Sequence, residues 1–150
     1  MRLYLVQHGK SLSEAEDPRR PLSPEGREET QRMADWLREL GIRVPEIWHS
    51  TKLRARETAE ILAEALGART VEKEGLAPLD DPLPVAEVLK DRAEDLLIAG
   101  HLPFLSRLTS LLLTGDPEKE VVKFRFSGCL ALLREDFWRM DWFLKPELRR

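Results

Sequence analysis

The stretch MRLYLVQHGKS, residues 1–11, decides the fold, because it holds an apolar run that stops abruptly on polar groups. Residues 2–6, RLYLV, are rich in β-forming side chains and predict a buried strand. Gln7, His8 and Gly9 follow this strand directly. An amide, an imidazole and a glycine at a strand end form either an ordinary loop or a site at the mouth of a sheet.

Length and composition describe a folded chain without a general affinity for anionic polymers. The chain has 150 residues, the length of one domain with a single core, and we expect residues 1–150 to form that domain. Hydrophobic residues make up 42% and charged residues 34%, which is typical of globular proteins and not of disordered ones. A net charge of -3 predicts no binding to nucleic acid or to a membrane, so an anion site must be a local cluster.

Cysteine usage and hydropathy indicate the compartment. Cys129 is the only cysteine, so no disulfide can form within the chain, and its neighbours GCLALL predict a buried strand. The chain has neither an apolar leader nor a run of transmembrane length, and we expect a cytoplasmic protein. Asparagine is absent, and charged residues are abundant. This composition is typical of a thermophile.

Strand-like runs alternate with helix-like segments along most of the chain. After the first strand, the pattern predicts strands over 45–50, 68–73 and 95–101 and helices over 23–41, 52–67, 81–91 and 105–114. The last third differs, because VVKFRFSG (121–128), CLALLRE (129–135) and FWRMDWFL (137–144) predict antiparallel strands, the last two joined by a tight turn near Asp136. We therefore expect a three-layer α/β/α fold with a mostly parallel sheet and an antiparallel C-terminal edge.

Two of the three histidines fall at strand ends of this fold. His8 follows the first strand, and Gly100 and His101 end the strand over 95–101. Ligands of open α/β sheets bind outside the carboxyl ends of the strands. This rule favours a site at the mouth of the sheet over an ordinary loop.

Arg54 adds a cation to the same edge. The strand over 45–50 ends at Ser50, and Arg54 falls in the first turn of the next helix. Its guanidinium offers forked donors suited to phosphate oxygens, beside a positive helix end that favours anions. A cationic pocket with two imidazoles indicates phosphoryl chemistry.

Other basic residues have plainer interpretations. Arg56 either faces the same pocket or pairs with Glu57 or Glu60 on the helix surface. Arg19 and Arg20 lie in a charged, proline-rich stretch, and we expect a solvated loop there.

Other chemistries lack their motifs. No HxH, HExxH or CxxC spacing supports a zinc site, so no metal is expected. No GxxxxGK[ST] or GxGxxG segment indicates a nucleotide, and no GxSxG elbow indicates a serine hydrolase, so no cofactor is expected either. His49 has no matching partner in the pattern, and we expect it to support the structure.

Three motifs resemble a known family when taken together. QHGKS, STKLRARETA and AGHLPFL are similar, in order and spacing, to the three signatures of the histidine phosphatase superfamily, and PLSPEG resembles the start of that family's first long helix. The short chain and the HLP after the strand resemble the SixA-type phosphohistidine phosphatases. The resemblance covers essentially the whole chain.

The resemblance implies a role for each matching residue. His8 is the expected nucleophile, which forms a transient phosphohistidine that water hydrolyses. Arg54 is expected to hold the phosphoryl oxygens, and His101 to donate a hydrogen bond to the charge that develops there. Gly9 lets the backbone approach the phosphate. Nearby positive charge should keep the imidazole of His8 neutral near pH 7.

Gln7 departs from the family, which places an arginine there as a second cationic fork. A neutral amide in its place should cost about 2–4 kcal/mol of transition-state stabilisation, roughly 30- to 1000-fold in rate. We hypothesise that Lys10 binds phosphate. Either Lys10 or Arg56 would then supply part of the positive charge that Gln7 lacks.

A general acid is harder to assign. Phosphate esters need a carboxylic acid to protonate the leaving alkoxide, and Asp17 and Glu74 are the candidates. A phosphohistidine needs less help, because a protonated imidazole already leaves well.

We expect a metal-independent phosphatase that hydrolyses phosphohistidine on a protein such as a histidine phosphotransfer domain, acting in signal transduction and releasing inorganic phosphate. Two alternatives are a phosphomonoesterase for a small metabolite and a binding module in which Gln7 marks lost turnover. No coiled-coil seam or long apolar edge requires a dimer, so we expect a monomer.

Overall fold

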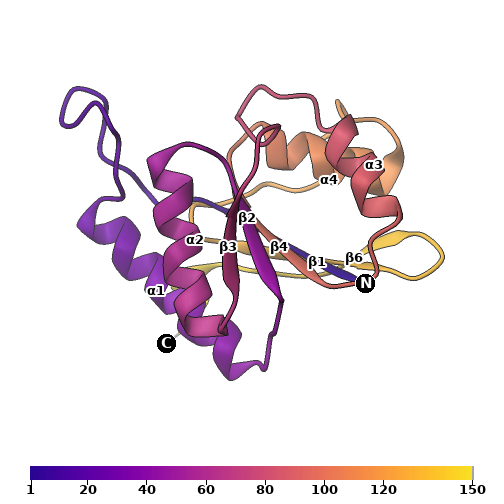
Figure 1. The fold of residues 1–150 in the computed structure, drawn as a ribbon, viewed down its shortest axis with the longest axis horizontal. Helices are drawn as coiled ribbons and strands as arrows, with labels where there is room; N and C mark the ends of the chain where they lie inside the picture. Colours follow the sequence, from indigo (N-terminus) through magenta and orange to yellow (C-terminus); the bar gives the residue numbers. More distant parts are fainter. Residues whose placement is uncertain (150) are drawn as a thin grey trace.

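In the computed structural model, which describes residues 1–149, helices cover both faces of a six-stranded sheet (Figure 1). The strands are β1 (Arg2–Gln7), β2 (Glu46–His49), β3 (Arg69–Glu72), β4 (Leu96–Gly100), β5 (Cys129–Arg134) and β6 (Trp138–Leu144). The helices are α1 (Pro24–Glu39), α2 (Leu53–Leu66), α3 (Leu83–Lys90) and α4 (Phe104–Thr114), with a 3-10 turn, η1, at Pro146–Leu148. The predicted α/β class is confirmed.

The sheet has the strand order β3-β2-β4-β1-β5-β6. Strands β1 to β4 run parallel, and β5 and β6 pair antiparallel at one edge. This arrangement confirms the expected mostly parallel sheet with an antiparallel C-terminal edge. It also makes β1 and β4, which are far apart in the sequence, central neighbours.

Helix α1 begins where the PLSPEG motif predicts. The Ser23 side chain accepts a hydrogen bond of 3.0 Å from the amide of Gly26, and Pro24 occupies the first turn, where its missing N–H is not needed. Gly26 packs directly on the loop after β1, because a Cβ at this position would lie 2.0 Å from the carbonyl oxygen of Lys10. The start of α1 is therefore pressed against the backbone that follows His8.

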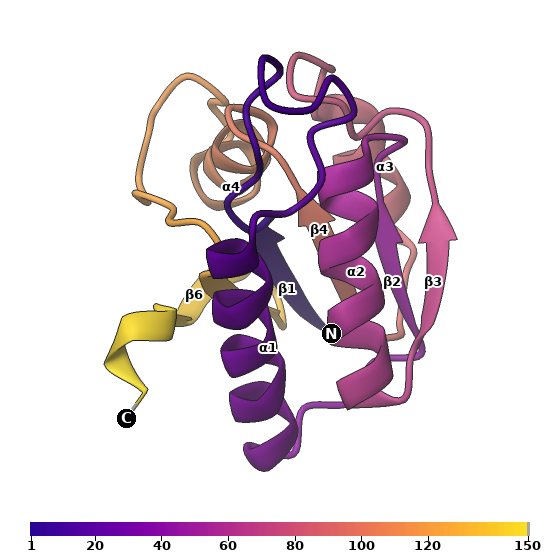
Figure 2. The same ribbon diagram turned by 90° about the vertical axis from the view of Figure 1, so that its left-hand side faces the viewer.

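One apolar cluster lies on each face of the sheet. Side chains from α1 and α2 pack against one face, around Val6 and Leu97, and those from α3 and α4 pack against the other, around Leu5 and Ile98. Because the chain leaves β1 towards one face and β4 towards the other, the two strand ends flank a switch point of the topology. Figure 2 shows β1 and β4 pointing to the same end of the molecule, beneath the loop over 8–23.

The predicted strand over 121–128 is wrong. These residues form the loop between α4 and β5, and Ser127 adopts a positive φ of 59° that no strand accommodates. The amide of Gly128 donates 2.8 Å to the carbonyl oxygen of Arg125, which closes a turn. Alternating apolar residues imitated a strand, but only some of them reach the core: Phe124 is buried, whereas Phe126 is 37% exposed.

The helices have the lengths of an ordinary globular fold. The longest within residues 1–149 is α1, with 16 residues, and it buries one face only. In the same part of the chain, no helix combines the length and the apolar character that crossing a bilayer requires.

Candidate active site

The centre of the candidate site is His8, at the carboxyl end of β1. Its backbone amide donates 2.9 Å to the carbonyl oxygen of Gly100, which continues the β1–β4 pairing by one residue. This bond places the ends of the two strands side by side. The imidazoles of His8 and His101 consequently lie with their ring centroids 5.1 Å apart, and both are buried.

Contacts with the backbone define the tautomer of His8. Nδ1 lies 2.7 Å from the carbonyl oxygen of Gly9, which can only accept, so Nδ1 carries the proton. Nε2 therefore keeps its lone pair. Gly9 has no room for a side chain, because a Cβ would lie 2.6 Å from Oγ1 of Thr30. Its amide donates 3.0 Å to Oγ1 of Thr58, which ties the loop after β1 to α2.

The second imidazole is oriented by Ser50, at the end of β2. The Ser50 hydroxyl lies 2.6 Å from Nε2 of His101 and accepts a bond of 3.2 Å from the amide of Lys52. A hydroxyl has one proton and two lone pairs, so Ser50 can donate that proton to Nε2 while it accepts from the amide. In the tautomer that accepts this bond, His101 carries its proton on Nδ1, a buried atom with no partner among residues 1–149.

Two arginines place positive charge beside both rings. Arg54 lies in the first turn of α2, and its Nε is buried without a partner in the described part of the chain. The carbonyl oxygen of Arg54 accepts a bond of 2.8 Å from Thr58, the residue that also holds Gly9. Arg20 is half-buried and donates 3.0 Å to Oγ of Ser11.

Burial and charge keep both imidazoles neutral. Burial lowers the pKa of His8 to about 4, the charges of Arg54 and Arg20 add to this effect, and the bond to Gly9 opposes it. Burial likewise lowers the pKa of His101 to about 3, followed by the effects of His8 and of nearby cations. Burial and the charge of Arg20 also lower the pKa of Arg54. The charged side chains that shift the pKa values of the two rings are thus cations.

Gln7, the residue before His8, is buried. The residue is 6% exposed, and its side-chain oxygen has no hydrogen-bond partner within residues 1–149. Its backbone carbonyl accepts 2.8 Å from the amide of Ser127. A neutral amide therefore occupies a buried position next to His8, where a cation was expected from the resemblance.

The structure does not bring Lys10 and Arg56 into the cluster. The ammonium of Lys10 is 2.7 Å from Glu25 and 3.9 Å from Glu29, both on α1, so carboxylates already neutralise it. Arg56 is exposed and pairs with Glu60 at 2.8 Å, one turn along α2. Neither position supports the hypothesis that these residues return the missing charge.

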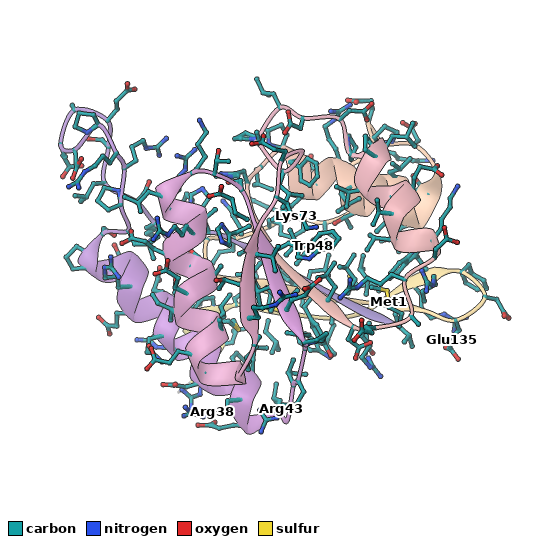
Figure 3. The ribbon with its side chains drawn as sticks, in the orientation of Figure 1. Met1, Arg38, Arg43, Trp48, Lys73 and Glu135 are labelled. Atoms are coloured by element: carbon teal, nitrogen blue, oxygen red, sulfur yellow. The ribbon has the colours of Figure 1, made fainter. Side chains whose placement is uncertain are left out.

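Neither candidate acid is among the groups that shift the pKa of His8 or His101. Asp17 pairs with Arg19 at 3.0 Å in the exposed loop, and bonds to Arg19 lower the pKa of its carboxyl group, which makes it a poorer acid near neutral pH. Glu74 follows β3 and lines a cavity of about 170 Å³ together with Trp48 and Lys73. Figure 3 shows Trp48 and Lys73 next to each other at this cavity, where the Lys73 ammonium lies 4.6 Å from the ring centroid.

Sequence reasoning missed Arg20, which we expected to be solvated. The chain reverses between Ser11 and Leu22, which form an isolated antiparallel bridge, and this reversal returns Arg20 to the residues after His8. The short spacing between the motifs at His8 and at Pro21 is the sequence feature that could have predicted this reversal. Arg20 has a positive φ of 49°, so its backbone conformation is unusual as well.

Phe126 was missed because the segment around it reads as a strand. Its ring centroid lies 5.5 Å from that of His8, at 50° between the planes. No residue pattern points to this contact, since it depends on the turn at Ser127. Among the described residues, no group of three or more histidine, cysteine or acidic side chains could hold a metal ion.

Neutral imidazoles lie beside arginines at the switch point of an α/β sheet, an arrangement whose chemistry suits a phosphoryl group. The model of the histidine phosphatase superfamily (branch 1) matches residues 3–80. The chain belongs to this superfamily and is an enzyme of the phosphatase class.

Individual relatives agree with this membership. The chain is 37% identical over 124 residues to an uncharacterised protein of Picosynechococcus, covering 77% of this chain and 75% of that protein. It is 28% identical over 123 residues to the phosphohistidine phosphatase SixA of Escherichia coli, covering 77% and 76% of the two chains. The solved structure of the protein histidine phosphatase SixA with tungstate has a TM-score of 0.87 over 100% of both chains, at 24% identity. The predicted SixA-type resemblance is confirmed.

The first prediction concerns protonation. In NMR titrations of the ring resonances, His8 should titrate near pH 4 and His101 near pH 3, because burial disfavours the charged rings. The variants His8→Gln and His101→Gln assign the signals. Between pH 6.5 and 4 the unfolded chain binds protons that the folded chain does not, so the free energy of unfolding falls with falling pH, by on the order of 1 kcal/mol per pH unit for each ring. A midpoint near 6.5 for either ring would show that it is not desolvated.

The second prediction concerns Ser50. Ser50→Ala leaves Nε2 of His101 buried without its hydrogen-bond partner, so the ring is no longer held in one tautomer. We expect kcat on an aryl phosphate to fall on the order of tenfold, while Ser50→Thr, which keeps the hydroxyl, retains most of the activity. Equal losses in the two variants would assign Ser50 a packing role only.

Proposed function

We propose that this protein is a phosphohistidine phosphatase that acts through a covalent phosphoryl group on His8. The observation that carries the proposal is the state of His8: a buried imidazole with a pKa lowered to about 4, its Nδ1 proton on Gly9 and its Nε2 lone pair free. A nucleophile in this state needs no base to activate it near pH 7.

In the first step, Nε2 of His8 attacks phosphorus and forms an N–P bond. The bond from phosphorus to the leaving nitrogen breaks, and its electron pair stays on the substrate imidazole. This imidazole leaves as a neutral molecule when its other ring nitrogen carries a proton. Arg54 and Arg20 bind the equatorial oxygens, and the Nδ1 proton of His101 binds the charge on them. The free donors of Arg54 and His101 support these roles.

In the second step, a water molecule attacks the phosphorus of phospho-His8. The N–P bond breaks and its electron pair returns to Nε2. Both protons of the water stay with the product, one on the attacking oxygen and one on another phosphate oxygen, and inorganic phosphate leaves.

The substrate class follows from the charges around the site. The charged groups that act on His8 are Arg54 and Arg20, and the two candidate carboxylates, Asp17 and Glu74, are engaged or placed elsewhere. An imidazole leaving group depends less on a general acid than an alkoxide does. This difference favours a phosphohistidine on a protein, such as a histidine phosphotransfer domain, over a small phosphate ester, and it is consistent with a role in cytoplasmic signal transduction.

The test is single-turnover hydrolysis of a phosphohistidine-bearing protein. His8→Ala should reduce the rate to the uncatalysed background, because no nucleophile remains. Arg54→Ala should reduce the rate on the order of 100- to 1000-fold through the loss of a charge-assisted bond. Arg56→Ala is the matched control, two residues along the same helix but paired with Glu60 at the surface, and should stay within about twofold.

The same assay measures the cost of Gln7. Gln7→Arg should raise the rate, by up to roughly 30- to 1000-fold, if the missing fork limits turnover. Hydrolysis at the native rate by His8→Ala would overturn the proposed function. Hydrolysis of small phosphate esters in preference to the phosphoprotein would leave the nucleophile in place and replace the substrate class.

A further inference from the structure

Phe126 presents an apolar ring at the edge of a cationic pocket. The side chain is 37% exposed, although its ring lies 5.5 Å from that of His8. His8 itself is 7% exposed and has His101 as its other ring neighbour, 5.1 Å away. Phe126 therefore joins the nearly buried nucleophile to the exposed surface, and we call this place the mouth of the site.

Contacts with Gln7 and Thr30 hold the backbone next to Phe126 in place. Ser127 is completely buried, and its amide donates 2.8 Å to the carbonyl oxygen of Gln7. Its hydroxyl lies 2.8 Å from Oγ1 of Thr30, on α1. Ser127 also adopts a positive φ of 59°, a conformation that costs free energy in a residue with a side chain. The surrounding contacts maintain it.

Arg125 holds the other side of the same turn. Its guanidinium forms a two-pronged pair with Glu29 of α1, at 3.1 and 2.5 Å, and donates 2.6 Å to the carbonyl oxygen of Phe126. Glu147 adds a third carboxylate contact at 2.9 Å. Phe126 is thus fixed between two anchored neighbours.

A single exposed apolar side chain needs no explanation on a protein surface. Three observations together distinguish Phe126: contact with the nucleophile, a strained and buried neighbour, and a two-pronged ion pair that anchors its turn. Packing of the core does not require an exposed ring at this place. The arrangement instead presents the ring to whatever enters the mouth.

We propose that Phe126 is a specificity-determining residue, a wall of the mouth against which a flat, unsaturated leaving group packs. The inference rests on the proposed function, because it takes the phosphoryl group to be bound at Nε2 of His8. An imidazole or phenol ring attached to that phosphorus then meets the Phe126 ring, whereas a saturated alcohol offers no complementary face. Aromatic pairs gain enough beyond area burial to favour the flat group by about two- to twelvefold.

The test uses ligands that no phosphatase step can cleave. Phenylphosphonate and cyclohexylphosphonate share a head group and carry rings of the same size, one flat and one saturated. Calorimetry gives their Kd values with the native protein, Phe126→Leu and Phe126→Tyr. The native preference for the phenyl compound should fall about two- to twelvefold in Phe126→Leu and should persist in Phe126→Tyr. Inorganic phosphate, titrated alongside, reports damage to the pocket itself.

Each result of these titrations either supports or overturns the role of Phe126. An unchanged phenyl preference in Phe126→Leu overturns the inference, and so does a loss of affinity that phosphate shares in full. Binding without hydrolysis of the phosphoprotein overturns the proposed function but leaves the role of Phe126 standing, provided the preference shifts. If neither phosphonate nor phosphate binds the native protein, both proposals fail.

Discussion

The site depends on one backbone hydrogen bond, from the amide of His8 to the carbonyl oxygen of Gly100. This bond extends the parallel pairing of β1 and β4 by one residue past the end of β1. Without it the two imidazoles, 93 positions apart in the sequence (101 − 8), would not meet at 5.1 Å. The other contacts refine this placement: Thr58 holds Gly9 from α2, Thr30 closes the space beside Gly9 from α1, and the turn before β5 closes the remaining side.

Burial and positive charge act in the same direction on the two rings. Both lower the pKa of His8 and of His101, so the two imidazoles are neutral near pH 7 beside the positive charges of arginines. Each ring has one nitrogen committed to the protein and one left for the ligand. Gly9 accepts the Nδ1 proton of His8, and the Ser50 hydroxyl lies 2.6 Å from Nε2 of His101. The lone pair on Nε2 of His8 is thus free, and Nδ1 of His101 has no partner among residues 1–149.

The strands and helices that form the frame were predictable, because long apolar runs such as those ending at Gln7 and Gly100 have few alternatives to a buried strand. His8, His101 and Arg54 follow from the rule that strand ends of a parallel sheet meet at one edge. What could not be predicted depends on contacts distant in sequence. Lys10 was expected to face a phosphate, but two carboxylates of α1 lie nearer to it. The prediction of a strand over 121–128 was wrong because contacts of Ser127 with Gln7 and Thr30 impose a turn there. The residue pattern of the segment does not indicate that turn.

The most direct test of the account is to trap the phosphorylated protein. A phosphohistidine survives alkaline quenching and is lost in acid, so a brief reaction with a phosphohistidine-bearing protein can be stopped with base and digested with trypsin. We expect one phosphoryl group on the peptide of residues 3–10, whose single histidine is His8, and loss of that label after acid treatment. Turnover at full rate with no label on this peptide, or with the label on another one, would contradict it.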